Sequence, residues 1–300
     1  MVYLLLFFSI HFGPDTVMLI LAAFVMHLAL SKAEDVCNTC VKVNTTCYEV
    51  MYLFDLQANF RTHIVINKME LLHSENILFY SYEPEIADPE YYKVAYIHIE
   101  NIDINGMVND NSTTHNFGTF AIHQEKSLVY LGGRDGIFTY DLSKKLAWYS
   151  SLGDEILTLF FSNNLYIVKS NDSRIIVKKG DTFNSVLEYI PIKNFVINKD
   201  NVIVFLSTFG LFLNKREETH WLSKNAFFRG LTVDLDGVVY TWWIDGIYKV
   251  DIMRNLGESK VVKVAHMNHI SGMTFDNENN ILVSFGKALY KMSVTNATLC

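Results

Sequence analysis

The sequence of 300 residues has few residues that interrupt regular structure. It contains four prolines and 15 glycines, and no Pro/Gly/Ser-rich linker gathers them. No domain boundary is evident, so a single domain is expected. Lys and Arg number 25 against 32 Asp and Glu, and the net charge of -7 argues against nucleic acid as a partner. Half of the residues are hydrophobic and only 19% are charged, which excludes a disordered chain.

Motifs of the easily recognised enzyme classes are also missing. The sequence has no GxSxG, HExxH, Gly-rich phosphate loop or EF-hand loop. We therefore expect no catalytic residue, no metal site and no cofactor. Cys37 and Cys40 form a CxxC pair, but no helix start follows Cys37 and no second CxxC or HxxxH completes a metal site. Neither a thioredoxin-like redox pair nor a zinc knuckle is expected.

Residues 1–31 differ in composition from the rest and are predicted to be a secretory signal peptide. Their apolar stretch from Met18 to Leu30 is shorter than the roughly 20 residues of a membrane span, and small residues at its end suit cleavage before Lys32. Two alternatives stay open: a start of translation at Met18, and an uncleaved N-terminal anchor. After cleavage we expect no contact with a membrane.

Secretion would place the mature chain in an oxidising compartment, where four cysteines should form two disulfides. The cysteines are Cys37, Cys40, Cys47 and Cys300. The candidate glycosylation sites, each an N-x-S/T sequon, are Asn44, Asn111, Asn171 and Asn296.

A repeat of about 37 residues runs through the rest of the chain, with copies that begin near positions 63, 120, 157, 195, 231 and 273. Each copy has an apolar strand, a turn rich in Asp, Asn and Gly, and two further apolar strands; most copies add a fourth, such as Leu146 to Ser150. Four antiparallel strands in about 40 residues are typical of a propeller blade. We predict an all-β fold in which residues 32–300 form one six-bladed β-propeller. A β-sandwich or β-solenoid with fortuitous repeats is the alternative.

The ends of the chain predict how the propeller closes. The last copy stops at Cys300 after three strands, whereas an orphan strand, Tyr48 to Leu56, precedes the first copy. We predict that this N-terminal strand completes the last blade and removes an unpaired edge. Cys300 should then bond to one of the three N-terminal cysteines and the other two to each other. Three connectivities remain possible.

One face of the propeller is predicted to bind a ligand at the mouth of the central channel. The loops between second and third strands, and those entering the innermost strands, contain more aromatic and cationic than acidic side chains, which suits a planar anion. The candidate ligand-binding residues are Arg134, Phe209, Phe228, Arg229, Trp242, Trp243, His269, Phe285 and Lys287. For any single aromatic residue the alternative is packing between blades. The acidic turns of the other face, such as Asp234 to Gly237, are interpreted as solvated turn formers.

Three features of the chain together resemble the ommochrome-binding proteins of insect haemolymph. They are the cysteine cluster leading into TCYEVMYLFDL, the terminal cysteine, and hairpins such as VYTWWIDGIYKVD. The resemblance implies a secreted, extracellular, non-enzymatic carrier in haemolymph, whose ligand is a planar pigment that carries carboxylates. We expect a monomer whose partner is this small-molecule pigment.

Hairpins such as TVDLDGVVY also resemble the six-bladed lactonases of the senescence-marker and gluconolactonase type. This second resemblance implies, as an alternative, a metal-dependent lactonase or esterase with a metal held by a Glu near the first inner strand, two Asn and an Asp. The segment Asn59 to Thr62, which enters the first inner strand here, has no matching Glu. A protein-interaction propeller that uses its rim is a third possibility.

Overall fold

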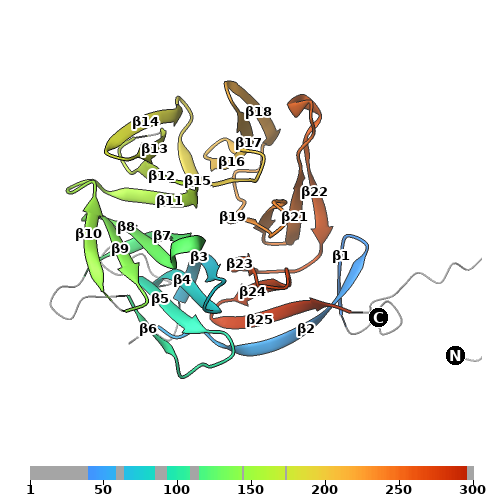
Figure 1. Ribbon diagram of the computed structural model, residues 1–300. Coiled ribbons are helices and arrows are strands. Elements are labelled where there is room, and N and C mark those ends of the chain that lie inside the picture. Colours follow the sequence, from blue (N-terminus) through green and yellow to red (C-terminus); the bar gives the residue numbers. More distant parts are fainter. Residues whose placement is uncertain are drawn as a thin grey trace, which may run out of the picture.

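The computed structural model describes residues 40–58, 64–84, 93–108, 115–143, 145–172 and 174–295. Six antiparallel sheets are arranged around a central axis (Figure 1). The predicted six-bladed β-propeller is confirmed. The predicted signal peptide, Cys37, Cys300, Asn111 and Asn296 lie outside the described residues.

Blades 1 to 5 each run from an innermost strand to an outer strand in chain order. Blade 1 consists of β3 (Ile64–Leu72), β4 (Ile77–Pro84), β5 (Lys93–His98) and β6 (Asn105–Met107). Blade 2 consists of β7 (Phe117–His123), β8 (Leu128–Gly133), β9 (Gly136–Asp141) and β10 (Leu146–Ser150). Blade 3 consists of β11 (Ile156–Ser162), β12 (Asn164–Lys169), β13 (Ile175–Lys179) and β14 (Thr182–Leu187). Blade 4 consists of β15 (Ile192–Ile197), β16 (Ile203–Ser207), β17 (Gly210–Lys215) and β18 (Glu218–Ser223). Blade 5 consists of β19 (Gly230–Val233), β20 (Val239–Trp243), β21 (Gly246–Asp251) and β22 (Lys260–Ala265). Blade 6 contains β23 (Gly272–Phe275), β24 (Ile281–Phe285) and β25 (Ala288–Val294), together with β2 (Thr46–Asp55) and β1 (Val41–Val43).

The innermost strands begin within a few residues of the starts that the repeat predicted. Two single-turn 3-10 helices, Gln124–Lys126 and Leu256–Glu258, are the helical elements of the described part. Within that part, no helix has the length and apolar composition of a membrane span.

The hydrophobic cores lie between neighbouring blades. Between blades 1 and 2, Phe79 of β4 packs against Phe120 of β7 with ring centroids 6.3 Å apart, and both side chains are fully buried. Tyr96 and Tyr140 of the same core lie 6.2 Å apart. Because each sheet is covered by a neighbour on both faces, the middle strands are almost continuously apolar rather than alternating.

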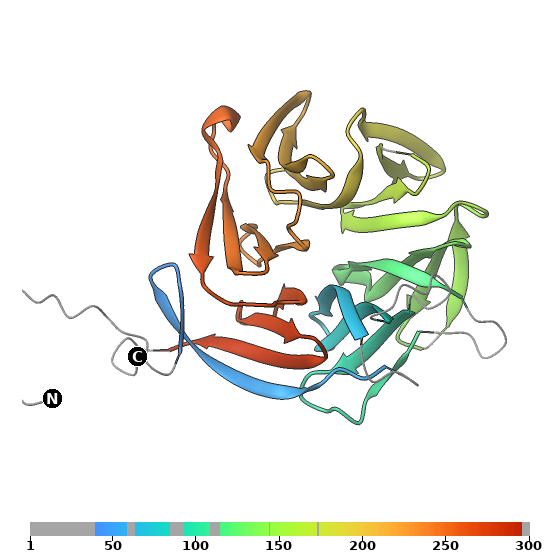
Figure 2. The same ribbon diagram turned by 180° about the vertical axis from the view of Figure 1, so that it is seen from behind.

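The N-terminal strand closes the ring. β2 pairs antiparallel with β25, from Tyr48 opposite Val294 to Asp55 opposite Ala288. The backbone N–H of Leu56 then donates to the carbonyl of Lys287 at 2.7 Å. This pairing confirms the predicted closure of the last blade. Figure 2 shows the hairpin of β1 and β2 beside β25, where β1 adds a fifth strand that the sequence did not predict.

The described cysteines and sequons lie near this closure or on the surface. Cys40 and Cys47 are both disulfide-bonded. The connectivity of the disulfides stays a prediction. Asn44, in the turn between β1 and β2, and Asn171, between β12 and β13, are exposed, so a glycan would have room at either position; their glycosylation also remains a prediction.

Candidate functional site

A cavity of about 510 Å³ opens at one end of the central channel. Its lining comes from inner strands and the loops that precede them, from the second strands β4 and β16, and from the end of β8 with the β8–β9 loop. Blades 1 to 5 all contribute. These loops belong to the face that was predicted to bind a ligand. The volume lies within the range of roughly 300 to 1,000 Å³ that is usual for small-molecule sites.

Four inner strands carry a β-bulge at the same level of the channel. The pairing register skips one residue in each of β3, β7, β11 and β15. The skipped residues, all of which line the cavity, are Asn67, Gly118, Leu157 and Lys193. A bulge leaves its extra residue unpaired and redirects the following side chains. The repeated bulges therefore explain why polar side chains from otherwise apolar strands reach the channel.

Lys68 closes the inner end of the cavity. Its Nζ donates to the carbonyl oxygens of Phe120 at 2.6 Å and Leu159 at 3.1 Å, and lies 3.4 Å from a carboxylate oxygen of Glu70. The inner strands of blades 1, 2 and 3 are joined through this ammonium group. Burial lowers the pKa of Lys68, and the nearby Glu70 carboxylate opposes that shift.

A smaller cavity of about 120 Å³ extends from Lys68 and Glu70 toward the opposite face, where His73 and Gln124 line it. Lys68 borders both cavities and so separates the two halves of the channel.

The large cavity has an excess of positive side chains. Four cationic residues line it: Lys68, Arg134, Lys193 and Arg229. Two acidic residues, Glu83 and Glu155, line it as well. This local excess contrasts with the net charge of -7 of the whole chain. Within the described ranges, no group of three or more His, Cys, Asp or Glu side chains is placed to hold a metal ion. The electrostatics of the lining favour an anionic group over a divalent cation.

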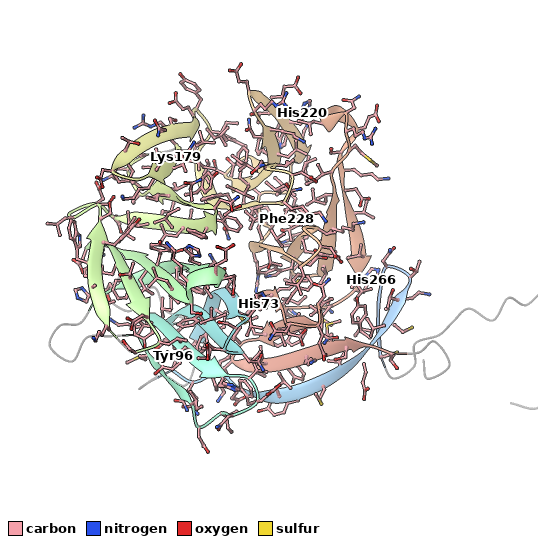
Figure 3. All side chains as sticks on the ribbon, viewed as in Figure 1. His73, Tyr96, Lys179, His220, Phe228 and His266 are labelled. Atoms are coloured by element: carbon pink, nitrogen blue, oxygen red, sulfur yellow. The ribbon has the colours of Figure 1, made fainter. Side chains whose placement is uncertain are left out.

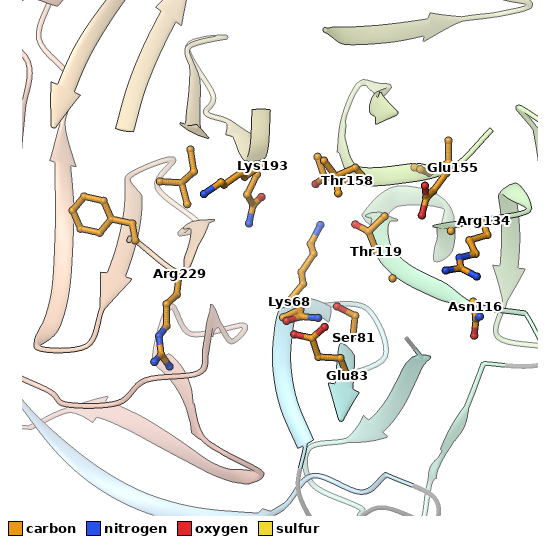
Figure 4. Close-up of a pocket in the computed structure, with 18 residues that line it drawn as sticks. Lys68, Ser81, Glu83, Asn116, Thr119, Arg134, Glu155, Thr158, Lys193 and Arg229 are labelled. Atoms are coloured by element: carbon orange, nitrogen blue, oxygen red, sulfur yellow. The ribbon is translucent and has the colours of Figure 1, made fainter. Parts of the chain in front are cut away.

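The structure brings three of the nine predicted ligand-binding residues into this lining. Arg134 lies in the β8–β9 loop, while Phe228 and Arg229 directly precede β19. Phe228 lies near the centre of the ring, whereas Lys179 lies farther out (Figure 3). A guanidinium nitrogen of Arg229 is 3.4 Å from the carbonyl oxygen of Ile270. Figure 4 shows Arg134 and Arg229 on opposite sides of the cavity, with Lys68 between them.

The two adjacent tryptophans lie outside the cavity lining. Trp242 is 2% exposed in the core between blades 5 and 6, and its Nε1 donates to the carbonyl of Ser271 at 3.3 Å. Trp243 packs into the core between blades 4 and 5, and its ring lies 6.5 Å from that of Phe227. Both aromatic surfaces are used in packing between blades, so the structure does not present them to the cavity.

The other four predicted residues also lie outside the lining. Phe285 packs against Tyr290 at 5.4 Å between ring centroids, and Lys287 pairs with Asp55 at 3.0 Å. His269 is an exposed residue with a φ of +64°. Phe209, in the β16–β17 loop, is exposed on the same face as the cavity.

Phe209 belongs to a wider set of exposed apolar side chains on this face. They lie in loops between second and third strands or in loops that enter inner strands. The set, with exposed fractions from 41% to 90%, consists of Leu152, Tyr189, Phe209, Phe227 and Ile244. These side chains supply apolar surface on the face that carries the cavity.

Sequence reasoning missed Lys68, which follows the bulge of β3, and two polar residues of the neighbouring strand β4, Ser81 and Glu83. The one visible signal for Lys68 was the pair of charged residues, Lys68 and Glu70, inside the otherwise largely apolar segment IVINKMELL.

The chain is similar to known proteins in sequence and in fold. No protein-family model matches the chain. Over 225 residues it is 28% identical to the ommochrome-binding protein of Manduca sexta, a match that covers 70% of this chain and 77% of that protein. The resemblance expected from the sequence is confirmed.

Among solved structures, a gluconolactonase from Xanthomonas campestris superimposes with a TM-score of 0.63 and 10% identity, over 85% of this chain and 95% of that one. A second gluconolactonase-like structure gives 0.59 and 9%, over 85% and 94%. At these identities the likeness shows the shared fold alone.

Proposed function

We propose that the protein is a secreted carrier that binds an ommochrome-type pigment, a planar aromatic anion, in the large cavity of the channel. The observation that carries this proposal is the charge of the lining, where four cationic side chains face two acidic ones in a chain of net charge -7. Similarity to the ommochrome-binding protein of Manduca sexta supports the same ligand class.

The cavity offers separate groups for the two parts of such a ligand. The guanidinium groups of Arg134 and Arg229 are exposed at the mouth, where they can pair with carboxylates. Leu157 lines the cavity with 47% of its side chain exposed, and Phe227 is 73% exposed on the same face. These apolar side chains would cover the faces of a ring system and remove them from water.

An extracellular location is part of the proposal. The apolar segment before Lys32 has the length of a signal peptide, and Cys40 and Cys47 are both disulfide-bonded. We propose a carrier without catalytic residues.

A metal-dependent lactonase is the second candidate, because gluconolactonases share the fold. Against it stands Lys68, which holds an ammonium group at the inner end of the cavity through two carbonyl oxygens. This fixed positive charge would repel a divalent cation at the same level of the channel.

The test is a titration of the purified protein with a xanthommatin-type pigment, followed by its visible absorption spectrum. Arg134→Ala should weaken binding by about 1 kcal/mol or more, roughly fivefold in Kd, because a charge-assisted hydrogen bond is lost. Arg254→Ala, an exposed arginine in the β21–β22 connection at the opposite end of the blades, is the matched control and should bind as the wild type does. Lactone hydrolysis that depends on added metal, without pigment binding, would favour the lactonase instead.

A further inference from the structure

The cavity contains charged side chains of both signs that do not pair with one another. Five charged residues of the lining form no ion pair with another described residue: Glu83, Arg134, Glu155, Lys193 and Arg229. The contrast with the adjacent position is clear, because Asp154 pairs with Lys169 at 2.7 Å. The lining thus keeps both carboxylates and cations available to a ligand.

Glu83 has no ion-pair partner among the residues that the structure describes. The side chain is half-buried on β4, and the neighbouring ammonium of Lys68 directs its hydrogen bonds to Phe120, Leu159 and Glu70 instead. Figure 4 shows Glu83 and Lys68 side by side in the middle of the cavity, between Arg134 on one side and Arg229 on the other.

A buried hydroxyl next to Glu83 also lacks a partner. Ser81 is 1% exposed and lines the cavity, and its Oγ makes no hydrogen bond within the part of the chain that the structure describes. Ser81 and Glu83 are two residues apart on β4 and so share one face of the strand. An unsatisfied buried hydroxyl is unfavourable, and a polar group of a ligand would satisfy it.

These observations restrict the charge of the ligand. A simple anion would meet the uncompensated carboxylates of Glu83 and Glu155, and a simple cation would meet the positive excess of the lining. A group that carries an ammonium beside a carboxylate avoids both conflicts.

We propose that the cavity recognises a zwitterion: its ligands are aromatic compounds with an α-amino acid group. The ammonium pairs with Glu83 and the hydroxyl of Ser81, and the carboxylate pairs with the cationic side chains of the lining. The proposal rests on the proposed carrier function and specifies which polar group of the ligand enters the cavity.

The experiment compares three compounds with the same indole ring by calorimetric titration of the disulfide-bonded protein. L-tryptophan carries both charges, tryptamine lacks the carboxylate, and indole-3-propionate lacks the ammonium. L-tryptophan should bind about tenfold more tightly than either of the others, because each missing charge removes one charge-assisted hydrogen bond. Equal affinity of L-tryptophan and indole-3-propionate, or no binding of L-tryptophan, would overturn the proposal.

Variants then assign the ammonium to Glu83. Glu83→Gln should weaken binding of L-tryptophan about tenfold and strengthen that of indole-3-propionate, because the first loses the partner of its ammonium and the second loses a repelling carboxylate. Ser81→Ala should reduce the same preference more weakly. Glu125→Gln, an exposed glutamate in the 3-10 helix after β7 on the opposite face, is the matched control. Equal losses for both compounds in Glu83→Gln would overturn the assigned role.

A pigment titration on the same samples separates this inference from the carrier function. Pigment binding without any preference for L-tryptophan overturns the zwitterion proposal alone. Preference for L-tryptophan without pigment binding supports the zwitterion site and overturns the pigment carrier.

Discussion

Replacing Leu56 by alanine tests how firmly the N-terminal strand holds the ring closed. Leu56 follows β2, is 2% exposed and belongs to the core shared by blades 1 and 6. In that core it lies with Ile64 and Leu78 of blade 1 and with Leu282 and Leu289 of blade 6. The side chain therefore contributes to the contact that makes the structure a closed ring.

The expected loss follows from the burial of this side chain. Truncation of a buried leucine removes transfer free energy and leaves a cavity, so the free energy of unfolding should fall by about 3 kcal/mol. In a domain of this size that loss corresponds to a decrease in Tm of roughly 6 to 12 °C. Met51→Ala on β2 is the matched control, because Met51 is 52% exposed and its truncation should cost no more than about 0.5 kcal/mol.

Urea unfolding followed by tryptophan fluorescence, with the disulfides intact, measures both variants. Calorimetry supplies the Tm values independently. Equal and small losses for Leu56→Ala and Met51→Ala would refute the reasoning, because the closing segment would then contribute no buried core.

Three further stability predictions use other parts of the ring. Gly230→Ala should destabilise the fold by about 1 to 3 kcal/mol in the same unfolding assay, because the new Cβ would lie 2.4 Å from the buried ring of Trp242. Burial acts to raise the pKa of Asp276, but the ion pair with Lys291 at 2.8 Å and the hydrogen bonds from Asn280 and from the backbone N–H of Glu278 together outweigh burial, so the pKa is lowered. The stabilisation that these contacts give is lost as pH falls below 3.8. Asp276→Asn should be less stable near pH 7 and lose less on acidification to pH 2. Burial lowers the pKa of Lys68, so the folded state releases this proton at a lower pH than the unfolded chain does. The free energy of unfolding of the wild type should therefore increase as the pH rises toward about 10.5, and Lys68→Met should lack that increase.

The fold was predictable because its signals are local and repeated. Apolar strands joined by Asp, Asn and Gly turns recur six times, and the missing outer strand of the last copy matched an orphan strand at Tyr48 to Leu56. The short β1 escaped prediction because a strand of three residues, Val41–Val43, has too little pattern to be recognised.

The site was predictable only in part, since a sequence places a residue in a loop without fixing the direction of its side chain. Arg134 and Arg229 do reach the cavity, whereas Trp242 packs between blades. Lys68 was missed because strict alternation from Ile64 and Ile66 would put it on the core face. The bulge after Ile66 changes that register, and bulges have no reliable sequence signal.

Binding of a xanthommatin-type pigment to two charge variants tests the central claim most directly. Leu157 lines the large cavity and is 47% exposed, whereas Leu235 lies at the opposite face and is 50% exposed, so a glutamate at either position costs similar burial. The account predicts a single pigment site in the wild type, roughly fivefold weaker binding in Leu157→Glu through repulsion of the anion, and unchanged binding in Leu235→Glu. Absence of binding to the wild type, or equal affinities of the two variants, would contradict a pigment site in this cavity.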